Sequence, residues 1–251
     1  MRVDQGSSSG ESQPATADYG IDSPPMLLSF VAAAFVAAIA GIFIGSGAGS
    51  ASAGIGPWIA SLLFAGAAAY MVWSSKRGKA KLWDQVLDDL ALTGQEKALD
   101  VGCGRGLVLI KLAHRLPKGK VSGVDVWRAK DQSGNAEVVC RANAEVEGVT
   151  DRVDIRTADM RELPFGDRSF DLVTASMSIH HLPLAADRGQ AVKEIIRVVK
   201  PGGKVVIVDV GKTFEYGAWL EDATFKDLKK SGLKFLTYPP SRVVSGRKPN
   251  S

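Results

Sequence analysis

The ten residues 97–106, KALDVGCGRG, constrain the fold of this chain more than any other stretch. A short apolar run ends there, and Gly102, Gly104 and Gly106 follow it before a helical pattern begins. This order predicts a strand, a tight turn and a helix. Glycine adopts positive φ and lets a ligand approach the backbone, and a helix N-terminus directs free N–H groups at the turn. The stretch therefore indicates a nucleotide or nucleoside site, although a tight turn without a ligand has the same pattern.

An acidic residue near the end of the next strand supports a ligand site. The run 120–126, KVSGVDV, carries Asp125, at a place where a carboxylate accepts hydrogen bonds from ribose hydroxyls. The spacing D-x-G-x-G-x-G differs from the G-x-G-x-x-G of dinucleotide-binding folds. No lysine followed by a hydroxyl residue ends the turn, which excludes a P-loop.

Five stretches, in order over about 120 residues, resemble the motifs of class I S-adenosylmethionine-dependent methyltransferases. Residues 100–106 are similar to the family's first motif, and Asp125 to its acid after the second strand. Residues 158–160 resemble the loop after the third strand, where an acid or amide meets the adenine. Residues 163–173 resemble the fourth-strand motif, and residues 199–204 the start of the fifth strand. The resemblance is specific for the family but not for a substrate.

The resemblance implies that S-adenosyl-L-methionine is the cofactor and that the carboxyl ends of the strands hold it. We expect no metal site, because the histidines and cysteines lack metal-ligand spacing. The residues expected to bind the cofactor are Asp100, Gly102, Cys103, Gly104, Gly106, Asp125, Val126, Asp159, Met160 and Ser176.

The alternation of strands and helices after residue 96 predicts an α/β fold with a parallel sheet covered on both faces. Strands are expected at 97–101, 120–126, 153–157, 170–176 and 204–210, and helices at about 106–116, 134–147, 187–199 and 217–231. Residues 234–238 and 242–245, around a proline turn, resemble the antiparallel hairpin that closes the family's sheet. We therefore expect a Rossmann-like, seven-stranded, mostly parallel sheet with helices on both faces, preceded by two transmembrane helices.

Two uncharged stretches of about nineteen residues, 26–44 and 55–73, are close to the length that crosses a bilayer. A buried core helix is the alternative for both stretches. A cleaved signal peptide is the alternative for the first, but that stretch lacks a basic n-region. The short uncharged connection predicts a helical hairpin, in which small residues such as Gly41 and Gly45 allow close approach. Basic residues follow at 76–81, which predicts a cytoplasmic catalytic domain and a cytoplasmic tail, in a membrane protein with two spans.

Composition and pattern divide the chain into four parts. Residues 1–25, which are rich in Ser, Gln, Gly and Asp, are expected to be a flexible tail. Residues 26–75 form the expected transmembrane hairpin, residues 76–95 a linker with an amphipathic helix at 79–92, and residues 96–251 the methyltransferase domain. The helix at 79–92 is expected to pack on the catalytic domain, with the bilayer surface as the alternative. The net charge of +4 is dispersed, so we expect no nucleic-acid partner.

His180 and His181 are the candidate catalytic residues, because they follow the fourth strand at the edge where ligands bind. A histidine titrates near neutrality and can deprotonate a thiol, phenol or enol. The alternative is that one or both histidines only hold the loop or face the cofactor. A base is needed only where the acceptor is protonated, because proximity and orientation supply most of the acceleration.

The membrane hairpin favours a small lipophilic acceptor, such as a quinone, a phenol or a lipid, since apolar molecules partition into the bilayer beside the site. One alternative is methylation of small thiols or other xenobiotic nucleophiles. Another is a membrane-tethered cofactor-binding protein that has no catalytic activity. The intact glycine motif and Asp125 argue against that last alternative.

Overall fold

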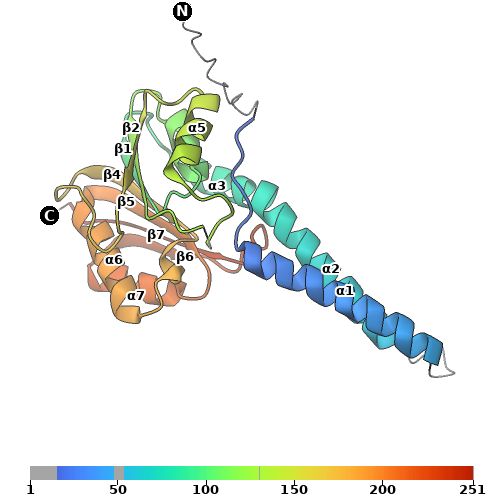
Figure 1. Ribbon diagram of the computed structural model, residues 1–251. Helices are drawn as coiled ribbons and strands as arrows, with labels where there is room; N and C mark the ends of the chain where they lie inside the picture. The colour runs from blue at the N-terminus through green and yellow to red at the C-terminus, as the bar shows by residue number, and fades with distance from the viewer. Residues whose placement is uncertain (1–15, 48–53, 130, 251) are drawn as a thin grey trace, which may run out of the picture.

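A seven-stranded sheet forms the centre of the computed structural model, which describes residues 16–47, 54–129 and 131–250 (Figure 1). In chain order the strands are β1 (Lys97–Val101), β2 (Lys120–Asp125), β3 (Val153–Thr157), β4 (Phe170–Ser176), β5 (Val199–Asp209), β6 (Lys226–Lys230) and β7 (Arg242–Arg247). The order in the sheet is β3-β2-β1-β4-β5-β7-β6, and β7 runs antiparallel to both of its neighbours. The prediction of a Rossmann-like, mostly parallel seven-stranded sheet is confirmed.

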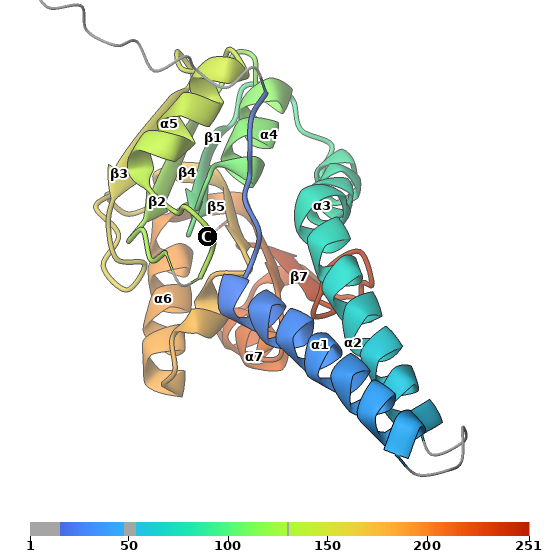
Figure 2. The ribbon, with the colours of Figure 1, turned by 45° about the vertical axis from the view of Figure 1, so that its right-hand side comes forward.

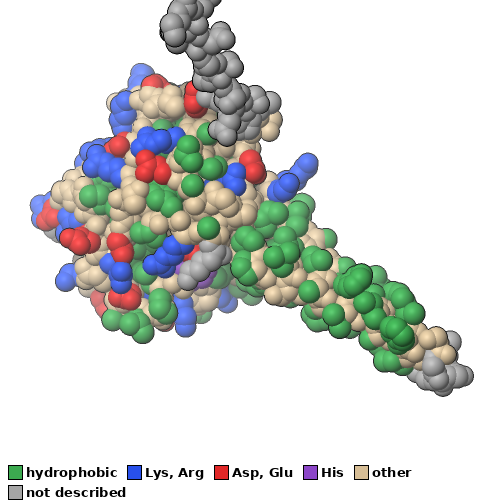
Figure 3. Space-filling model, in the orientation of Figure 1, with side chains coloured by type: hydrophobic (Ala, Val, Ile, Leu, Met, Phe, Trp, Pro, Cys, Tyr) green, Lys and Arg blue, Asp and Glu red, His purple; other side chains and the backbone are tan. Residues whose placement is uncertain are grey.

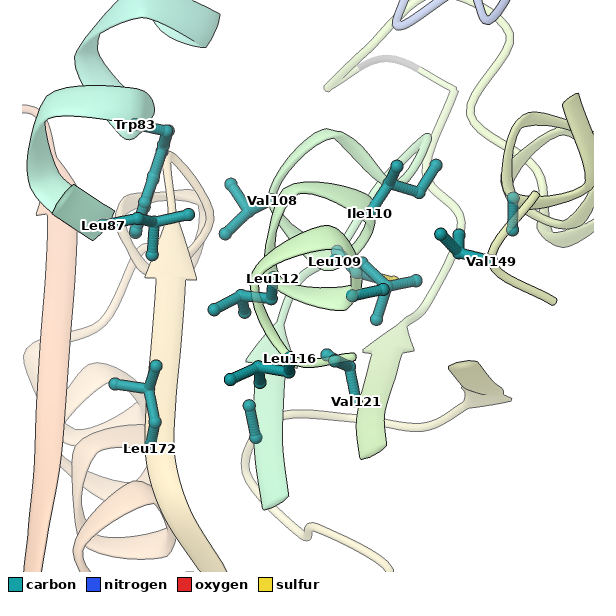
Figure 4. Packing of buried hydrophobic residues seen from close by; sticks show 14 of the residues in the cluster. Trp83, Leu87, Val108, Leu109, Ile110, Leu112, Leu116, Val121, Val149 and Leu172 are labelled. Atoms are coloured by element: carbon teal, nitrogen blue, oxygen red, sulfur yellow. The ribbon is translucent and has the colours of Figure 1, made fainter. Parts of the chain in front are cut away.

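Helices cover both faces of the sheet because successive strand residues point to opposite sides. Ala98 packs with α3 (Lys79–Asp88), α4 (Leu107–Arg115) and α5 (Glu137–Val146). Its neighbour Leu99 packs with α6 (Ala185–Val198) and α7 (Thr213–Asp222) on the other face. Figure 4 shows the first of these cores, in which Trp83 and Leu87 of α3 lie beside the side chains of α4 on the same face of the sheet. The predicted packing of the amphipathic helix on the domain is thereby observed, although the helix ends at Asp88 and not at 92.

The end of the chain differs from the prediction. The helix expected at 217–231 ends at Asp222, and residues 226–230 form the edge strand β6. The Lys, Asp and Leu residues of this segment are compatible with a helix, so the sequence did not indicate a strand. The strand forms because it pairs with β7. The strand expected at 234–238 is absent from the described residues of that segment, which connect β6 to β7 and make only an isolated bridge between Lys234 and Ser241.

The two apolar stretches form an antiparallel helical hairpin that projects from the domain (Figures 1 and 2). Helix α1 spans Pro24–Gly47 and helix α2 spans Ile55–Trp73, and a π-helical turn, η2 (Ser74–Gly78), continues α2 directly into α3. The helices approach closely at small residues, as predicted: a Cβ on Gly41 would lie 3.0 Å from the Trp58 ring. The outer face stays apolar and open, with Leu62 and Phe43 each 72% exposed.

Residues 18–23 are placed differently from the flexible tail that we expected. This segment, here called the strap, runs along the catalytic domain and enters α1 at its base (Figure 2). Arg105 of the glycine turn donates to the backbone oxygen of Asp18 at 2.8 Å, and the Ile21 N–H donates to Ser133 Oγ at 2.8 Å. Composition does not reveal this order, because Arg105 and Ser133, which hold the strap, lie more than 80 residues away in the sequence. Residues 1–15 of the expected tail lie outside the described residues.

Candidate active site

The glycine turn between β1 and α4 folds back against β2. The N–H groups of Gly102 and Cys103 both donate to the carbonyl of Val124, at 2.8 and 3.0 Å. Gly102 and Gly104 have φ of 72° and 52°. A Cβ on Gly102 would lie 2.3 Å from the Ser178 side chain. The turn therefore requires glycine for its conformation and for its close contacts.

Asp125 ends β2 beside this turn, as the sequence predicted. Its Oδ2 accepts from the Gly104 N–H at 2.8 Å, and its Oδ1 accepts from the Trp127 N–H at 2.6 Å. The Asn135 amide also donates to Oδ1 at 3.4 Å, so Oδ2 is the oxygen that keeps a further lone pair for a ligand. The three hydrogen bonds hold the carboxylate at the mouth of the turn.

Asp100 is deeply buried in the site, with 1% of its surface exposed. Its Oδ1 accepts from the Thr174 hydroxyl at 2.8 Å, whereas its Oδ2 has no hydrogen-bond partner among the described residues. Burial raises the pKa of Asp100 to about 7. A buried carboxylate oxygen without a partner is costly, so a ligand donor that meets it is expected to bind well.

The structure gathers most of the other predicted cofactor residues around the same cavity. Asp159 pairs with Arg161 at 2.7 Å, and hydrogen bonds from Arg161 lower the pKa of Asp159. Ser176 accepts from the Trp83 indole at 2.8 Å, which links α3 to the end of β4. Gly106 does not line the cavity, because it forms the N-cap of α4 with φ of 90°. The predicted cofactor residues that line the cavity are Asp100, Gly102, Cys103, Gly104, Asp125, Val126, Asp159, Met160 and Ser176.

Cys103 and Cys140 lie side by side, although their spacing indicated no pair. Both thiols are buried and reduced. A hydrogen bond between them, together with burial, raises the pKa of Cys103 well above its usual range. Cys103 is therefore a neutral thiol in the wall of the cavity and not a nucleophile.

The two histidines occupy η3 (Ile179–His181), a short 3-10 helix after β4, and their ring centroids are 4.0 Å apart. His181 lines the cavity and lies 3.5 Å from Asp131. Burial and the adjacent His180 lower the pKa of His181, so its ring is neutral at pH 7. His180 does not line the cavity, and Oδ1 of Asp209 accepts its Nδ1–H at 2.5 Å. Burial alone would lower the pKa of His180, but the hydrogen bond and charge of Asp209 raise it.

Several residues of the site were missed from the sequence. Asp209 ends β5 as Asp125 ends β2, so the same signal, an acid after an apolar strand, would have found it. Asp22 and Lys79 line the cavity from the strap and from α3, and nothing local in the sequence marks them. The other residues that line the cavity are Arg105, Leu107, Val108, Val124, Arg128, Asp131, Gln132, Asn135, Ala158, Met177, Ser178 and Leu182.

Comparison with known proteins bears directly on this geometry. Residues 99–207 match the family described as "Methyltransferase domain". The chain carries a class I S-adenosylmethionine-dependent methyltransferase domain. The methyltransferase GfsG of Streptomyces halstedii is 37% identical over 130 residues, which are 52% of this chain and 43% of that protein. The demethylmenaquinone methyltransferase of Staphylococcus aureus is 34% identical over 134 residues, which are 53% of this chain and 51% of that protein.

The chain therefore spans about half the length of these curated relatives, or less. The sterol 4-C-methyltransferase of Caenorhabditis elegans is 34% identical over 131 residues, 52% of this chain and 36% of that protein. Among solved structures, the [4+2]-cyclase SpnF superposes with a TM-score of 0.60 at 20% identity, covering 70% of this chain and 84% of that one. A structural likeness at this identity establishes the fold alone.

The cavity of this domain fits the family's cofactor, S-adenosylmethionine, on its own geometry. The unpartnered Oδ2 of Asp100 suits a ligand ammonium. A Cβ on Gly104 would lie 2.6 Å from the Gln132 side chain, so only glycine lets Gln132 pack against the turn at the wall of the cavity. Assignment of the individual binding residues stays a prediction that binding measurements test.

Proposed function

We propose that this chain is a membrane-anchored methyltransferase that transfers the methyl group of S-adenosylmethionine directly to a small lipophilic acceptor of the quinone, phenol or lipid type. The cavity includes Asp22, two residues before α1 begins, and Lys79, six residues after α2 ends. This observation carries the proposal, because residues next to the domain-side ends of both apolar helices line the cavity. An acceptor dissolved in the bilayer has a short path to the site.

The surface of the hairpin supports a membrane location. Apolar side chains cover its visible face (Figure 3), and residues 26–73 include no charged residue. Both helices are long and apolar enough to cross a bilayer. A buried core helix of a soluble protein has few exposed apolar side chains, whereas fifteen large ones are exposed among the described residues between Leu28 and Trp73. The basic residues that follow the second helix support a cytoplasmic location of the catalytic domain.

The relatives support an apolar acceptor. Two of them are named for a sterol and for demethylmenaquinone, and both acceptors are lipophilic. When bound, the cofactor supplies a methyl group already activated on a sulfonium. The chain has to align the acceptor, exclude water and remove a proton where the acceptor atom carries one.

His181 is the proposed base, because its ring is neutral at pH 7 and it faces the cavity. His180 is proposed as a positioning residue, since Asp209 fixes its ring and its ring packs on that of His181. Asp209 is held in turn by the Tyr216 hydroxyl, which donates to its Oδ2 at 3.2 Å.

The test is transfer of labelled methyl groups by the full chain in lipid nanodiscs. The acceptor panel contains a demethylated quinol, a sterol and a prenylated phenol in the bilayer, with small thiols in the water. We expect label on a lipophilic acceptor, and a lower level of label with the Asp125→Ala variant at a subsaturating cofactor concentration. Transfer to the thiols alone would overturn the lipophilic acceptor and leave the hairpin as a tether.

A further inference from the structure

The cavity holds a buried cation whose role the family resemblance does not supply. The side chain of Lys79 is 8% exposed, and its Nζ lies 2.7 and 2.9 Å from the two carboxylate oxygens of Asp22. Both residues line the cavity. Lys79 begins α3, and Asp22 lies in the strap, two residues before α1. The ion pair therefore joins the bases of the two apolar helices at the wall of the cofactor cavity.

The ammonium of Lys79 has more donor capacity than Asp22 uses. A lysine ammonium has three N–H donors, and Asp22 accepts two of them. No third acceptor lies within hydrogen-bond distance of Nζ in the part of the chain that the structure describes. The third N–H is thus available to a ligand in the cavity.

An opposite and equally unsatisfied group lines the same cavity. Oδ2 of Asp100 is buried without a partner among residues 16–47, 54–129 and 131–250. The charge of Lys79 acts on Asp100 across the cavity. A buried cation with a free donor and a buried carboxylate with a free acceptor complement an α-amino acid zwitterion.

We propose that Lys79, held by Asp22, binds the α-carboxylate of the cofactor's methionine moiety, while Asp100 meets its α-ammonium. The hairpin is then part of the cofactor site and not only an anchor, because residues at both of its bases form the carboxylate subsite. The Lys79 subsite depends on the cofactor alone, so its test is independent of the acceptor.

The structure offers a simple alternative role for the pair. A buried ion pair can merely tie two elements together, and such a pair adds little net stability. The two roles differ in what Lys79→Met does to ligands with and without an amino acid group. If the pair is only a structural tie, Lys79→Met should weaken the binding of both ligands equally or of neither. If Lys79 binds the carboxylate, the substitution should weaken only the binding of the ligand that has the carboxylate.

The experiment is calorimetric titration of the detergent-solubilised full chain with two ligands. S-adenosylhomocysteine carries the α-amino acid group, and 5′-methylthioadenosine lacks it. We expect Lys79→Met to weaken S-adenosylhomocysteine about 10- to 100-fold, as the loss of a charged hydrogen bond predicts. The affinity for 5′-methylthioadenosine should stay within about twofold, and Lys79→Arg should retain most of the affinity for both ligands.

Two further variants keep the test decisive. Lys81→Met removes an exposed lysine two residues along the same helix and should change neither affinity. If Lys79→Met fails to fold, the double variant Asp22→Asn with Lys79→Gln removes both charges and leaves no unpaired buried ion. Equal affinities of wild type and the double variant for S-adenosylhomocysteine would overturn the proposal, as would a parallel loss of both ligands in a folded Lys79→Met protein.

Discussion

At the scale of single residues, three carboxylates with different surroundings lie at or beside the cavity. Asp125 is hydrogen-bonded to the glycine turn, Asp100 is buried with a free oxygen, and Asp209 holds His180. Their positions follow one rule, since each stands at or near the carboxyl end of a parallel strand. Their proposed roles differ because their burial and hydrogen-bond partners differ, and neither can be read from the sequence.

Removal of the Asp125 carboxylate should weaken cofactor binding. A charged hydrogen bond to a ribose contributes about 1.5–3 kcal/mol, so Asp125→Ala should lower the affinity for S-adenosylhomocysteine tenfold or more. Asp151→Ala, at an exposed surface acid, is the matched control. Calorimetry that finds the same affinity for wild type and Asp125→Ala would contradict the ribose role.

Asp100 should make cofactor binding depend on pH. Its pKa is about 7 in the free protein, and a bound ammonium favours the ionised carboxylate. Affinity for S-adenosylhomocysteine should therefore rise with pH from 5 to 7, by up to about tenfold per unit, and level off above 7. Binding below pH 7 should release a proton, which titrations in buffers of different ionisation heat detect. The Asp100→Asn variant should lose this slope, and a slope that persists in it would assign the effect to another group.

The two histidines should respond differently to substitution. For an acceptor that must lose a proton, His181→Ala should lower kcat about 10²- to 10⁴-fold and change S-adenosylhomocysteine affinity little. Because the pKa of His181 is lowered, the acidic limb of the kcat profile should lie below pH 6.5. His180→Ala should have the smaller effect, because its ring faces Asp209 and not the cavity. A His181→Ala enzyme with nearly full turnover would show that alignment alone suffices.

At the scale of elements, apolar periodicity and turn residues predicted the strands that depend on local sequence. Each of the first five predicted strands is observed, and β1, β3 and β4 have the expected bounds. The prediction of a helix over the residues of β6 was wrong, because pairing with β7 overrides the helical propensity of the lysines in this strand. The order of the strap was missed because Arg105 and Ser133 hold it from distant parts of the chain. Elements that depend on partners far away in the sequence could not be predicted from local sequence patterns.

The hairpin should place both of its ends on the cytoplasmic side. Cys103 and Cys140 are buried, so an impermeant thiol reagent should report on an introduced cysteine alone. A cysteine in the connection, Ser50→Cys, should react from the periplasmic or lumenal side of intact cells or vesicles. Ser9→Cys, before the strap, should react only after the membrane is opened. Labelling of Ser9→Cys from the outside would contradict the predicted topology.

At the scale of the whole molecule, the apolar hairpin and the catalytic domain share a wall. The strap precedes α1, η2 continues α2 into α3, and both routes lead to the cofactor cavity. Tyr70 near the end of α2 also donates to the backbone of the β6–β7 connection, at Phe235. The molecule therefore positions its site at the base of the hairpin, which is where the proposed bilayer surface lies.

The most direct test of a membrane-facing methyltransferase is to measure whether the transferred methyl group ends up in lipid-soluble or water-soluble products. Carbonate-washed membranes that contain the full chain are incubated with methyl-labelled S-adenosylmethionine and then extracted with organic solvent. We predict that the protein stays in the membranes and that label enters the organic phase, at a level that Asp125→Ala membranes do not reach. Release of the protein by carbonate, or label confined to water-soluble products, would contradict the account.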